Sequence, residues 1–310
     1  MAVTMAEISK LRKLTGAGMM DCKNALNEAN GDIEAAKEII RKKGQAVAAK
    51  REDREASEGC VLAAANGDFA AIVALKCETD FVAKNDTFRE FVEAVATQAV
   101  NSDAADMDAF MEEKWNEDPS KTVKDALVEK VAVIGENLKI RRFEKVVATN
   151  GCVVSYVHGG GRIGVIVEAE TAVVNDAVKE ALTNLAMQIA ALNPKYVSRD
   201  EISEEYIAHE KEILLAQIMN DPKESQKPEK VINGMIEGRV SKELKEICLV
   251  DQVYVKAEDG KQTVAKYLDE VSKAVGTPVS VKRFVRFETG EGIEKKQEDF
   301  AAEVAAQMNA

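Results

Sequence analysis

The chain has 310 residues, of which 46 % are hydrophobic and 31 % charged, so it contains enough apolar material for a folded core. Its 42 basic and 54 acidic residues leave a net charge of −12. This balance argues against broad binding to nucleic acids or anionic membranes, because such binding comes mainly from Lys and Arg contacts with phosphates. We therefore expect neither a direct nucleic-acid partner nor a membrane partner.

Residue types that signal export or metal binding are sparse or scattered. We expect no signal peptide, and no run approaches about 18 uninterrupted apolar residues, the length that spans a membrane. The five cysteines form no CxxC pair, and only two histidines occur. This pattern predicts reduced, mostly buried thiols in a cytoplasmic protein, with no metal site and no cofactor.

Residues 1–55 are predicted to form a small module of three helices. Thr4 is suited to cap the first helix, and Asp32 to cap the third, which we expect to stop near Gly44. Charges of alternating sign over residues 50–55 indicate a solvated linker.

An imperfect internal duplication follows this module. In each copy a hairpin of two apolar runs precedes the start of an amphipathic helix, and the two helix starts lie 90 residues apart. The repeated elements are 59–77, with a turn at 66–67, then Asn85, and 151–167, with a turn at 158–161, then Asn175. The repeat predicts an α+β fold built from two related halves.

The remaining periodic segments complete the predicted organisation. We expect helices over 122–133, 201–220, from 229 onward, 263–275 and 294–308, and strands over 138–148, 253–255 and 279–287. The predicted units are the module and linker at 1–55, a first core subdomain at 56–149, a second at 150–290 with a helical hairpin inserted at about 200–247, and a C-terminal helical module at 291–310.

Enzyme chemistry is poorly supported by the motifs. The chain has no GxxxxGK[ST] loop, and although residues 158–161 (His-Gly-Gly-Gly) are similar to an esterase oxyanion segment, no GxSxG nucleophile motif occurs. Cys152 and His158 would make a thiol pair without a third orienting group. We predict that the protein is not an enzyme, with an esterase or thiol activity as the weaker alternative.

Two segments are not explained by folding alone. Phe81 lies between a strand and a helix, and aligning the two halves places Thr171 at its position, so the scaffold does not require an aromatic ring there. Phe81 either fills the core under the following helix or acts as an apolar wedge for a partner. Met19 and Met20 follow a glycine turn, and they either pack the small module or form an adaptable binding surface.

Five segments, in this order, closely resemble the bacterial translation elongation factor Ts family, and the resemblance extends over nearly the whole chain. The segments are Thr15–Lys23, Thr79–Lys84, Ile134–Asn137, His158–Val165 and Gly292–Lys295.

The resemblance implies a guanine-nucleotide exchange factor for the GTPase elongation factor Tu. It implies a ubiquitin-associated-like (UBA-like) N-terminal domain, a core of two related subdomains, a helical hairpin of dimerisation type and a C-terminal helix, and it allows a homodimer formed through the hairpin. The segment implied to disturb the Mg²⁺ and phosphate site of the GTPase, and so to release GDP, comprises Thr79, Asp80, Phe81, Val82, Ala83 and Lys84, with Phe81 as the wedge. The other implied partner contacts are Leu11, Met19, Met20, Lys23, Ile134, Gly135 and His158.

An exchange factor needs differential affinity for two states of its partner and no catalytic group, which agrees with the missing enzyme motifs. The alternative from another class is a chaperone-like module that holds a peptide or ribosomal partner through residues 1–55 alone.

Overall fold

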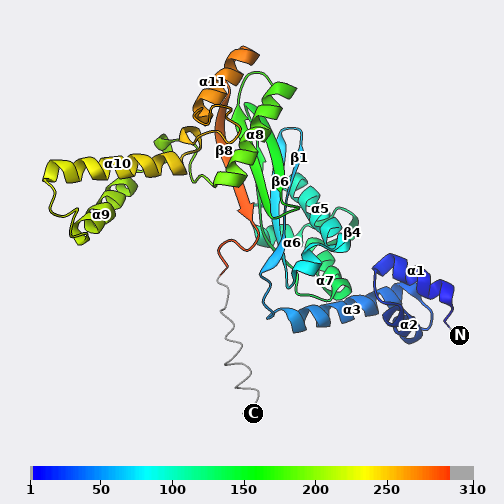
Figure 1. The fold of residues 1–310 in the computed structure, drawn as a ribbon. Coiled ribbons are helices and arrows are strands. Elements are labelled where there is room, and N and C mark those ends of the chain that lie inside the picture. The colour runs from blue at the N-terminus through cyan, green and yellow to red at the C-terminus, as the bar shows by residue number, and fades with distance from the viewer. Residues whose placement is uncertain (1–2, 294–310) are drawn as a thin grey trace, which may run out of the picture.

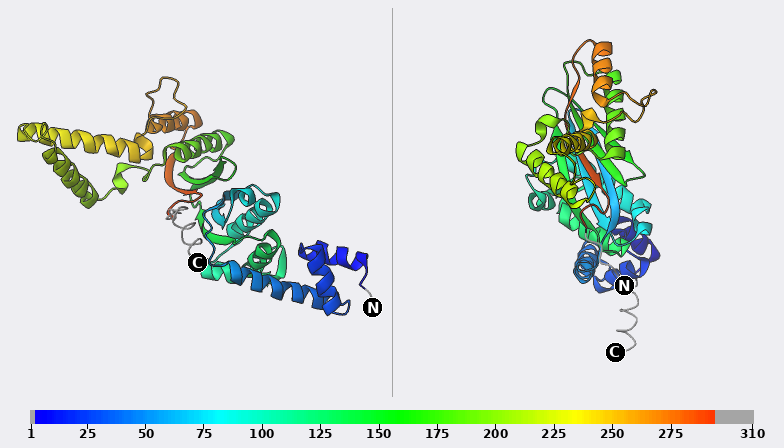
Figure 2. Two further views of the ribbon diagram at one scale, coloured as in Figure 1. Left: turned by 60° about the horizontal axis from the view of Figure 1, so that its bottom comes forward. Right: turned by 60° about the vertical axis from the view of Figure 1, so that its left-hand side comes forward.

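The computed structural model describes residues 3–293. The helix expected at 294–308, with its apolar stripe of Phe300, Val304 and Met308, lies outside these residues. Figure 1 shows a small helical module at one end, a central pair of sheets with helices, and a helical hairpin that projects on the opposite side. The views in Figure 2 show the same extended arrangement from two further directions.

The N-terminal module is formed by three helices around a small apolar core. They are α1 (Met5–Thr15), α2 (Met19–Glu28) and α3 (Ile33–Arg51). Thr4 and Glu7 form a reciprocal capping box at the start of α1, and the Asp32 side chain accepts hydrogen bonds from two amides at the start of α3. Buried side chains from all three helices, including Leu11, Leu26 and Ala36, make up this core.

The third helix does not stop near Gly44, as the sequence pattern suggested, but continues to Arg51. Gly44 is buried where α3 crosses α7 (Val123–Ile134), and a Cβ at this position would lie 3.2 Å from Cβ of Ala132. The glycine therefore permits close helix packing, and the predicted linker is correspondingly shorter.

The first half of the core is an antiparallel sheet covered by helices on its outer face. The strands, in spatial order, are β1 (Glu58–Asn66), β2 (Phe69–Cys77) and β5 (Lys139–Val147), and the covering helices are α4 (Asp80–Ala83), α5 (Asp86–Asn101) and α7. Phe88, Phe91 and Val95 of α5 pack on this sheet, and the Asn85 side chain caps the helix.

The second half repeats this arrangement. Its strands, in spatial order, are β6 (Gly151–His158), β7 (Ile163–Glu170) and β8 (Ser280–Glu288), and its covering helices are α8 (Asp176–Leu192) and α11 (Val264–Val275). Each sheet carries a register shift at the same place, opposite Ala74 in one and Glu168 in the other. The α+β class and the duplication predicted from the sequence are confirmed.

The two sheets pack face to face through a third apolar cluster. It contains Val61, Ile72 and Val146 from the first half and Ile166 and Phe287 from the second. A Cβ on Gly164 would lie 2.6 Å from Cγ1 of Val61 and 3.0 Å from Cδ1 of Ile72, so a larger residue here would displace side chains of the facing sheet. The halves are therefore held together by burial of apolar side chains.

Some elements differ from the sequence-based expectation. A short helix α6 (Met107–Glu112) and a two-stranded ribbon, β3 (Lys114–Trp115) with β4 (Asp118–Thr122), were not predicted. Residues 253–255 do not form a strand, since only an isolated bridge joins Val253 to Thr263. Phe110 and Trp115 bury their rings in the first core, which explains why this irregular segment is ordered.

The projecting hairpin consists of α9 (Glu204–Asn220) and α10 (Glu229–Ile247), flanked by the short 3₁₀ turns η1 (Arg199–Glu201) and η2 (Leu249–Asp251). A separate apolar cluster, including Ile218, Ile236 and Leu244, lies between the two helices. Within residues 3–293, no helix combines the length and apolar character needed to cross a membrane.

Candidate functional site

Phe81 is exposed to solvent on the one-turn helix α4. Its side chain is 82 % exposed, so the interpretation that it fills the core under α5 is wrong. Its neighbours Val82 and Ala83 are half-buried and pack against the first core, which leaves the aromatic ring as the outward face of the turn. A large exposed aromatic side chain in a folded protein is typical of a binding site.

The α4 turn is an insertion present in one half of the core only. Strand pairing places Gly59 opposite Lys76 and Gly151 opposite Glu170, so Lys76 corresponds to Glu170, 94 residues later. The helix caps Asn85 and Asn175 are only 90 residues apart, so the first half has four additional residues between strand and helix. The alignment of Phe81 with Thr171 was therefore wrong, because Thr171 corresponds to Cys77.

A capping hydrogen bond and an exposed ion pair lie within the α4 turn. The Thr79 hydroxyl accepts a hydrogen bond from the Val82 amide, 3.3 Å away. Lys84 Nζ lies 2.7 Å from a carboxylate oxygen of Asp80. The hydrogen bond from Lys84 and its positive charge lower the pKa of Asp80 below its ordinary value, so this carboxylate is charged at neutral pH. The aromatic ring is therefore presented on an ordered turn with a charged pair beside it.

Glu136 connects the 134–137 segment to the α4 turn. Its carboxylate accepts hydrogen bonds from the Glu78 and Thr79 amides, each at 3.0 Å, and from the Thr79 hydroxyl at 2.6 Å. Ile134 is half-buried at the end of α7, and Gly135 ends that helix in the left-handed conformation with φ of 84°. Two segments singled out in the sequence are thus joined directly.

Arg89 connects the α4 turn to the turn between β6 and β7. Its guanidinium donates hydrogen bonds to the carbonyl of Ala83 at 3.3 Å and to that of Gly160 at 3.1 Å. A pocket of about 450 Å³ lies between these elements, lined by Asp80, Lys84 and the 159–161 glycines among others. His158 is exposed beside the pocket and lies 2.9 Å from the Tyr156 hydroxyl.

The geometry excludes the thiol pair considered from the sequence. Cys152 is buried at one end of β6 and His158 lies at the other, six residues away, which corresponds to roughly 20 Å along a strand. Burial also raises the pKa of the Cys152 thiol above its ordinary value. Cys77, under the α4 turn, has its pKa raised to about 12 by burial, so it remains a neutral thiol.

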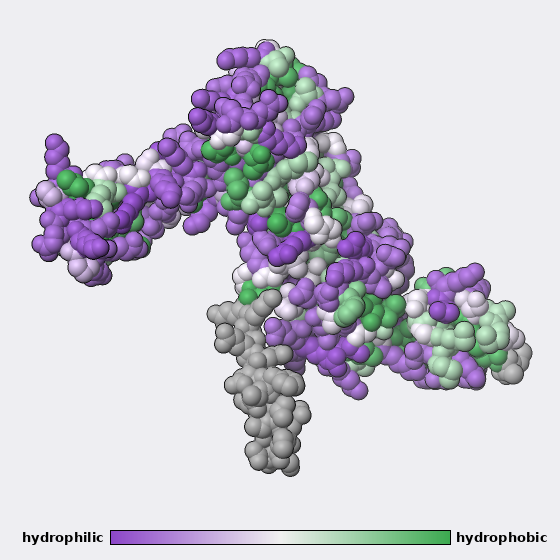
Figure 3. Space-filling view, in the orientation of Figure 1, coloured by the Kyte–Doolittle hydropathy of each residue, from purple (hydrophilic) through white to green (hydrophobic). Residues whose placement is uncertain are grey.

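A second exposed apolar surface lies on the N-terminal module. The side chains of Met19 and Met20 are 48 % and 63 % exposed, and Lys23 is exposed next to them. Green residues gather on this module in the space-filling view of Figure 3. The interpretation that these methionines pack the module is wrong, whereas Leu11 is fully buried and cannot contact a partner directly.

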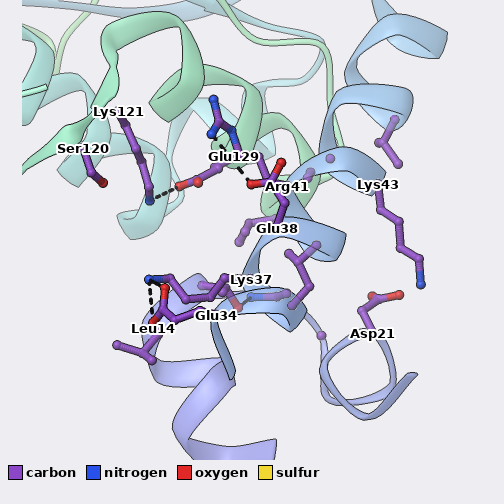
Figure 4. Close-up of a pocket in the computed structure, with 18 residues that line it drawn as sticks. Leu14, Asp21, Glu34, Lys37, Glu38, Arg41, Lys43, Ser120, Lys121 and Glu129 are labelled. Atoms are coloured by element: carbon purple, nitrogen blue, oxygen red, sulfur yellow. Dashed lines mark hydrogen bonds and ion pairs between the residues drawn. The ribbon is translucent and has the colours of Figure 1, made fainter. Parts of the chain in front are cut away.

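The N-terminal module and the core meet at a second pocket, of about 350 Å³ (Figure 4). Arg41 of α3 lies 2.8 Å from Asp125 of α7, and Lys121 lies 2.7 Å from Glu129 on the core side. The Arg41–Asp125 ion pair and the close helix contact at Gly44 attach α3 to the core, whereas the Lys121–Glu129 pair joins β4 to α7 within the core.

Sequence reasoning missed two residues that organise the site, Arg89 and Glu136. Glu136 belongs to a segment that the resemblance singled out, but no role followed from that. Arg89 gave no signal, because its acceptors lie on two other elements that only the fold brings together.

Comparison with known proteins identifies the family. The family model "Elongation factor TS" matches residues 78–291. Proteins named Elongation factor Ts from Clostridium novyi (strain NT) and Clostridioides difficile (strain 630) are each 48 % identical, and one from Clostridium tetani (strain Massachusetts / E88) is 47 % identical; each match covers 99 % of this chain and 99 % of the relative. The chain belongs to the elongation factor Ts family.

The resemblance identified from five motifs is confirmed by this membership, and the chain is thereby placed among translation elongation factors. All three segments around α4 lie inside the residues matched by the elongation factor Ts model, whereas Met19 and Met20 precede it. The matches to whole relatives include the N-terminal module as well.

Proposed function

We propose that this protein is the guanine-nucleotide exchange factor for elongation factor Tu in translation elongation, acting in the cytoplasm. The observation that carries the proposal is the exposed Phe81 ring, held on an ordered turn where the 79–84, 134–137 and 158–161 segments meet. Family membership supports the choice of partner. The protein acts by binding and is not itself an enzyme.

Exchange follows from linkage between two binding equilibria. GDP is held in a GTPase by Mg²⁺ and by hydrogen-bond donors around its phosphates. A protein that binds the nucleotide-free state more tightly than the GDP-bound state lowers the affinity of the GTPase for GDP by the same factor. Phe81 inserts into the GTPase domain with Asp80 beside it and disturbs the Mg²⁺ and phosphate site. The order of the turn before binding supports this role, because less conformational freedom is lost on association.

The remaining partner contacts are divided between two surfaces. Ile134, Gly135 and His158 border the Phe81 site, and Met19, Met20 and Lys23 form a second contact on the N-terminal module. We propose the domain division of residues 1–55, 56–149, 150–290 and 291–310, with the hairpin of the third unit available for a homodimer.

The test measures release of a fluorescent GDP analogue from elongation factor Tu. We expect this protein to accelerate release strongly, and Phe81→Ala to reduce the acceleration about thirtyfold or more, as for truncation of an interface hot spot. Phe69→Ala is the matched control, since Phe69 is a partly exposed aromatic residue at the far end of the same hairpin.

Each result of this assay has a definite meaning. If Phe81→Ala accelerates GDP release as strongly as the wild-type protein, Phe81 is not the residue mainly responsible for release, although the exchange function stands. No acceleration by the wild-type protein on intact partner would overturn the function and favour the chaperone-like alternative.

A further inference from the structure

The α4 turn is too short to hold its own conformation. A helix of four residues has only a few internal hydrogen bonds, such as those from the Ala83 amide to the Thr79 carbonyl and from the Lys84 amide to the Phe81 carbonyl. These are too few to offset the cost of ordering its backbone, since isolated helices are marginal below about 12 residues. Its order must come from contacts with other parts of the chain. Lys84 and Asp80 are largely exposed, and an exposed ion pair contributes little.

The strongest contacts at the start of the turn come from Glu136. Gly135 ends α7 in the left-handed conformation and directs the next residue toward the end of β2. One Glu136 oxygen accepts two amide hydrogen bonds, from Glu78 and Thr79, and the other accepts the Thr79 hydroxyl at 2.6 Å. Hydrogen bonds to a charged acceptor are roughly twice as strong as neutral ones.

The contact to the hydroxyl also orients the cap of the turn. A threonine hydroxyl has a single proton, and donating it to Glu136 leaves the oxygen lone pairs of Thr79 to accept from the Val82 amide, 3.3 Å away. Glu136 thereby fixes Thr79 directly, and through the Thr79 hydroxyl it orients the acceptor of the Val82 amide.

A reciprocal contact fixes the position of Glu136 itself. The Glu78 carboxylate accepts a hydrogen bond of 2.6 Å from the Asn137 amide, so each segment caps the backbone of the other across 59 residues of sequence. The Asn137 side chain is buried and donates to the carbonyl of Arg54 at 2.7 Å. Glu136 is therefore held by a network that reaches the chain leading from the N-terminal module.

We propose that Glu136 is a positioning residue for nucleotide exchange, which holds α4 in the conformation that presents Phe81 to the GTPase. This inference rests on the proposed function, and it assigns Glu136 no contact with the partner. Its effect passes through Thr79 and the α4 backbone to the aromatic ring. If Glu136 acts in this way, its substitution changes the exchange rate only when the Phe81 ring is present.

The experiment is a double-mutant cycle in the GDP-release assay with Glu136→Gln, Phe81→Ala and the two combined in the full-length protein. The Gln side chain keeps the size of Glu but cannot accept all three hydrogen bonds. We expect Glu136→Gln alone to slow exchange about tenfold, and to change the rate by less than about twofold when Phe81 is already Ala.

Two further measurements separate positioning from general loss of structure. Glu117→Gln is the matched control, because it removes the same charge from the exposed turn between β3 and β4 of the same half; we expect the wild-type rate. Amide hydrogen exchange at Val82 should become faster in Glu136→Gln, while the amides of α5 and α8 keep their protection.

Three outcomes would overturn the inference or its basis. A wild-type exchange rate in folded Glu136→Gln would show that Glu136 does not position Phe81. An equal loss with and without Phe81 would show that Glu136 acts elsewhere. If the wild-type protein fails to accelerate GDP release while Phe81→Ala behaves identically, the proposed function fails, and the positioning role fails with it.

Discussion

Glu168 illustrates how a single residue can join two strands. Its side chain is 2 % exposed and lies 2.9 Å from Lys282 and 2.7 Å from Arg283, two consecutive residues of β8 that the register shift places opposite it. Burial by itself would raise the pKa of this carboxyl, but the hydrogen bonds and charges of the two basic residues outweigh it, and the pKa lies below its ordinary value.

This lowered pKa predicts a pH-dependent contribution to stability. Because the folded pKa is below the unfolded value near 4.5, the carboxylate stabilises the fold above that value, and the stabilisation is lost as pH falls through the folded pKa. We expect Glu168→Gln to lower the free energy of unfolding by about 1–3 kcal/mol at pH 7. Urea unfolding from pH 7 down to pH 3 should show the difference in the free energy of unfolding between the two proteins shrinking as pH falls below 4.5, and a constant difference would contradict this account.

Two glycines at different positions predict opposite effects of the same substitution. Gly164→Ala would force a methyl group against Val61 between the sheets, and we expect a loss of about 1–3 kcal/mol in the free energy of unfolding. Gly234 lies exposed within α10, with open space where an added methyl group would stand, so Gly234→Ala should stabilise by about 0.5–1 kcal/mol. Thermal and urea unfolding measure the change in the free energy of unfolding for each variant. Equal changes in the two variants would contradict the close approach of the sheets at Gly164.

At the scale of elements, the α9–α10 hairpin projects from the sheets and has an apolar core of its own. Its apolar cluster lies between its own two helices, and the Tyr206 hydroxyl donates to Glu243 at 2.9 Å where the two helices meet the core. One turn earlier in α10, Arg239 makes two hydrogen bonds of 2.8 Å to the carboxylate of Glu224, which lies in the loop between the two helices. These contacts hold the helices to each other more than to the sheets.

This separation predicts that the hairpin can be shortened without unfolding the core. We expect a protein in which a short Gly-Ser linker replaces residues 207–242 to keep the core hydrogen-exchange protection of β2, β7 and α8. Its maximal acceleration of GDP release should stay within about threefold of wild type, because Phe81 and its supports lie in the other half. Loss of core protection, measured by the same exchange experiment, would show that the hairpin is required for folding.

At the scale of the whole molecule, two exposed surfaces are carried by different units. Phe81 lies on the duplicated core, and Met19 and Met20 lie on the N-terminal module, which is attached through the contact of α3 with α7. In a protein with two contact surfaces, one can supply affinity while the other supplies the change in the partner.

The division predicts different kinetic effects for the two surfaces. We expect Met19→Ala combined with Met20→Ala to raise the half-saturating concentration in the GDP-release assay about tenfold with little change in maximal rate, whereas Phe81→Ala lowers the maximal rate. Met5→Ala, another exposed methionine of the module, is the control. The chaperone-like alternative would be favoured if binding activity were lost only in the Met19 and Met20 variant and were retained by residues 1–55 alone.

Much of the fold was readable from the sequence because its signals are local. The caps at Thr4, Asn85 and Asn175 satisfy amides two or three residues away. The first hairpin turn lies at residues 67–68, one residue later than expected, because Asn66 ends β1 and Gly67 alone takes the positive φ. Both kinds of signal are local, so these elements do not depend on distant parts of the chain. The repeat of these signals indicated two α+β halves. The family motifs in turn pointed to the Phe81 segment.

By itself, the sequence determined the α+β class, the duplication, the family and the segments that carry its motifs. Only the tertiary structure decided that α3 continues through Gly44, that Phe81 faces solvent on a four-residue insertion, and that Glu136 and Arg89 support it. The physical reason is the same in each case. Whether a glycine ends a helix, a ring is buried, or a charge finds a partner depends on which distant element packs against it, and that contact exists only in the folded chain.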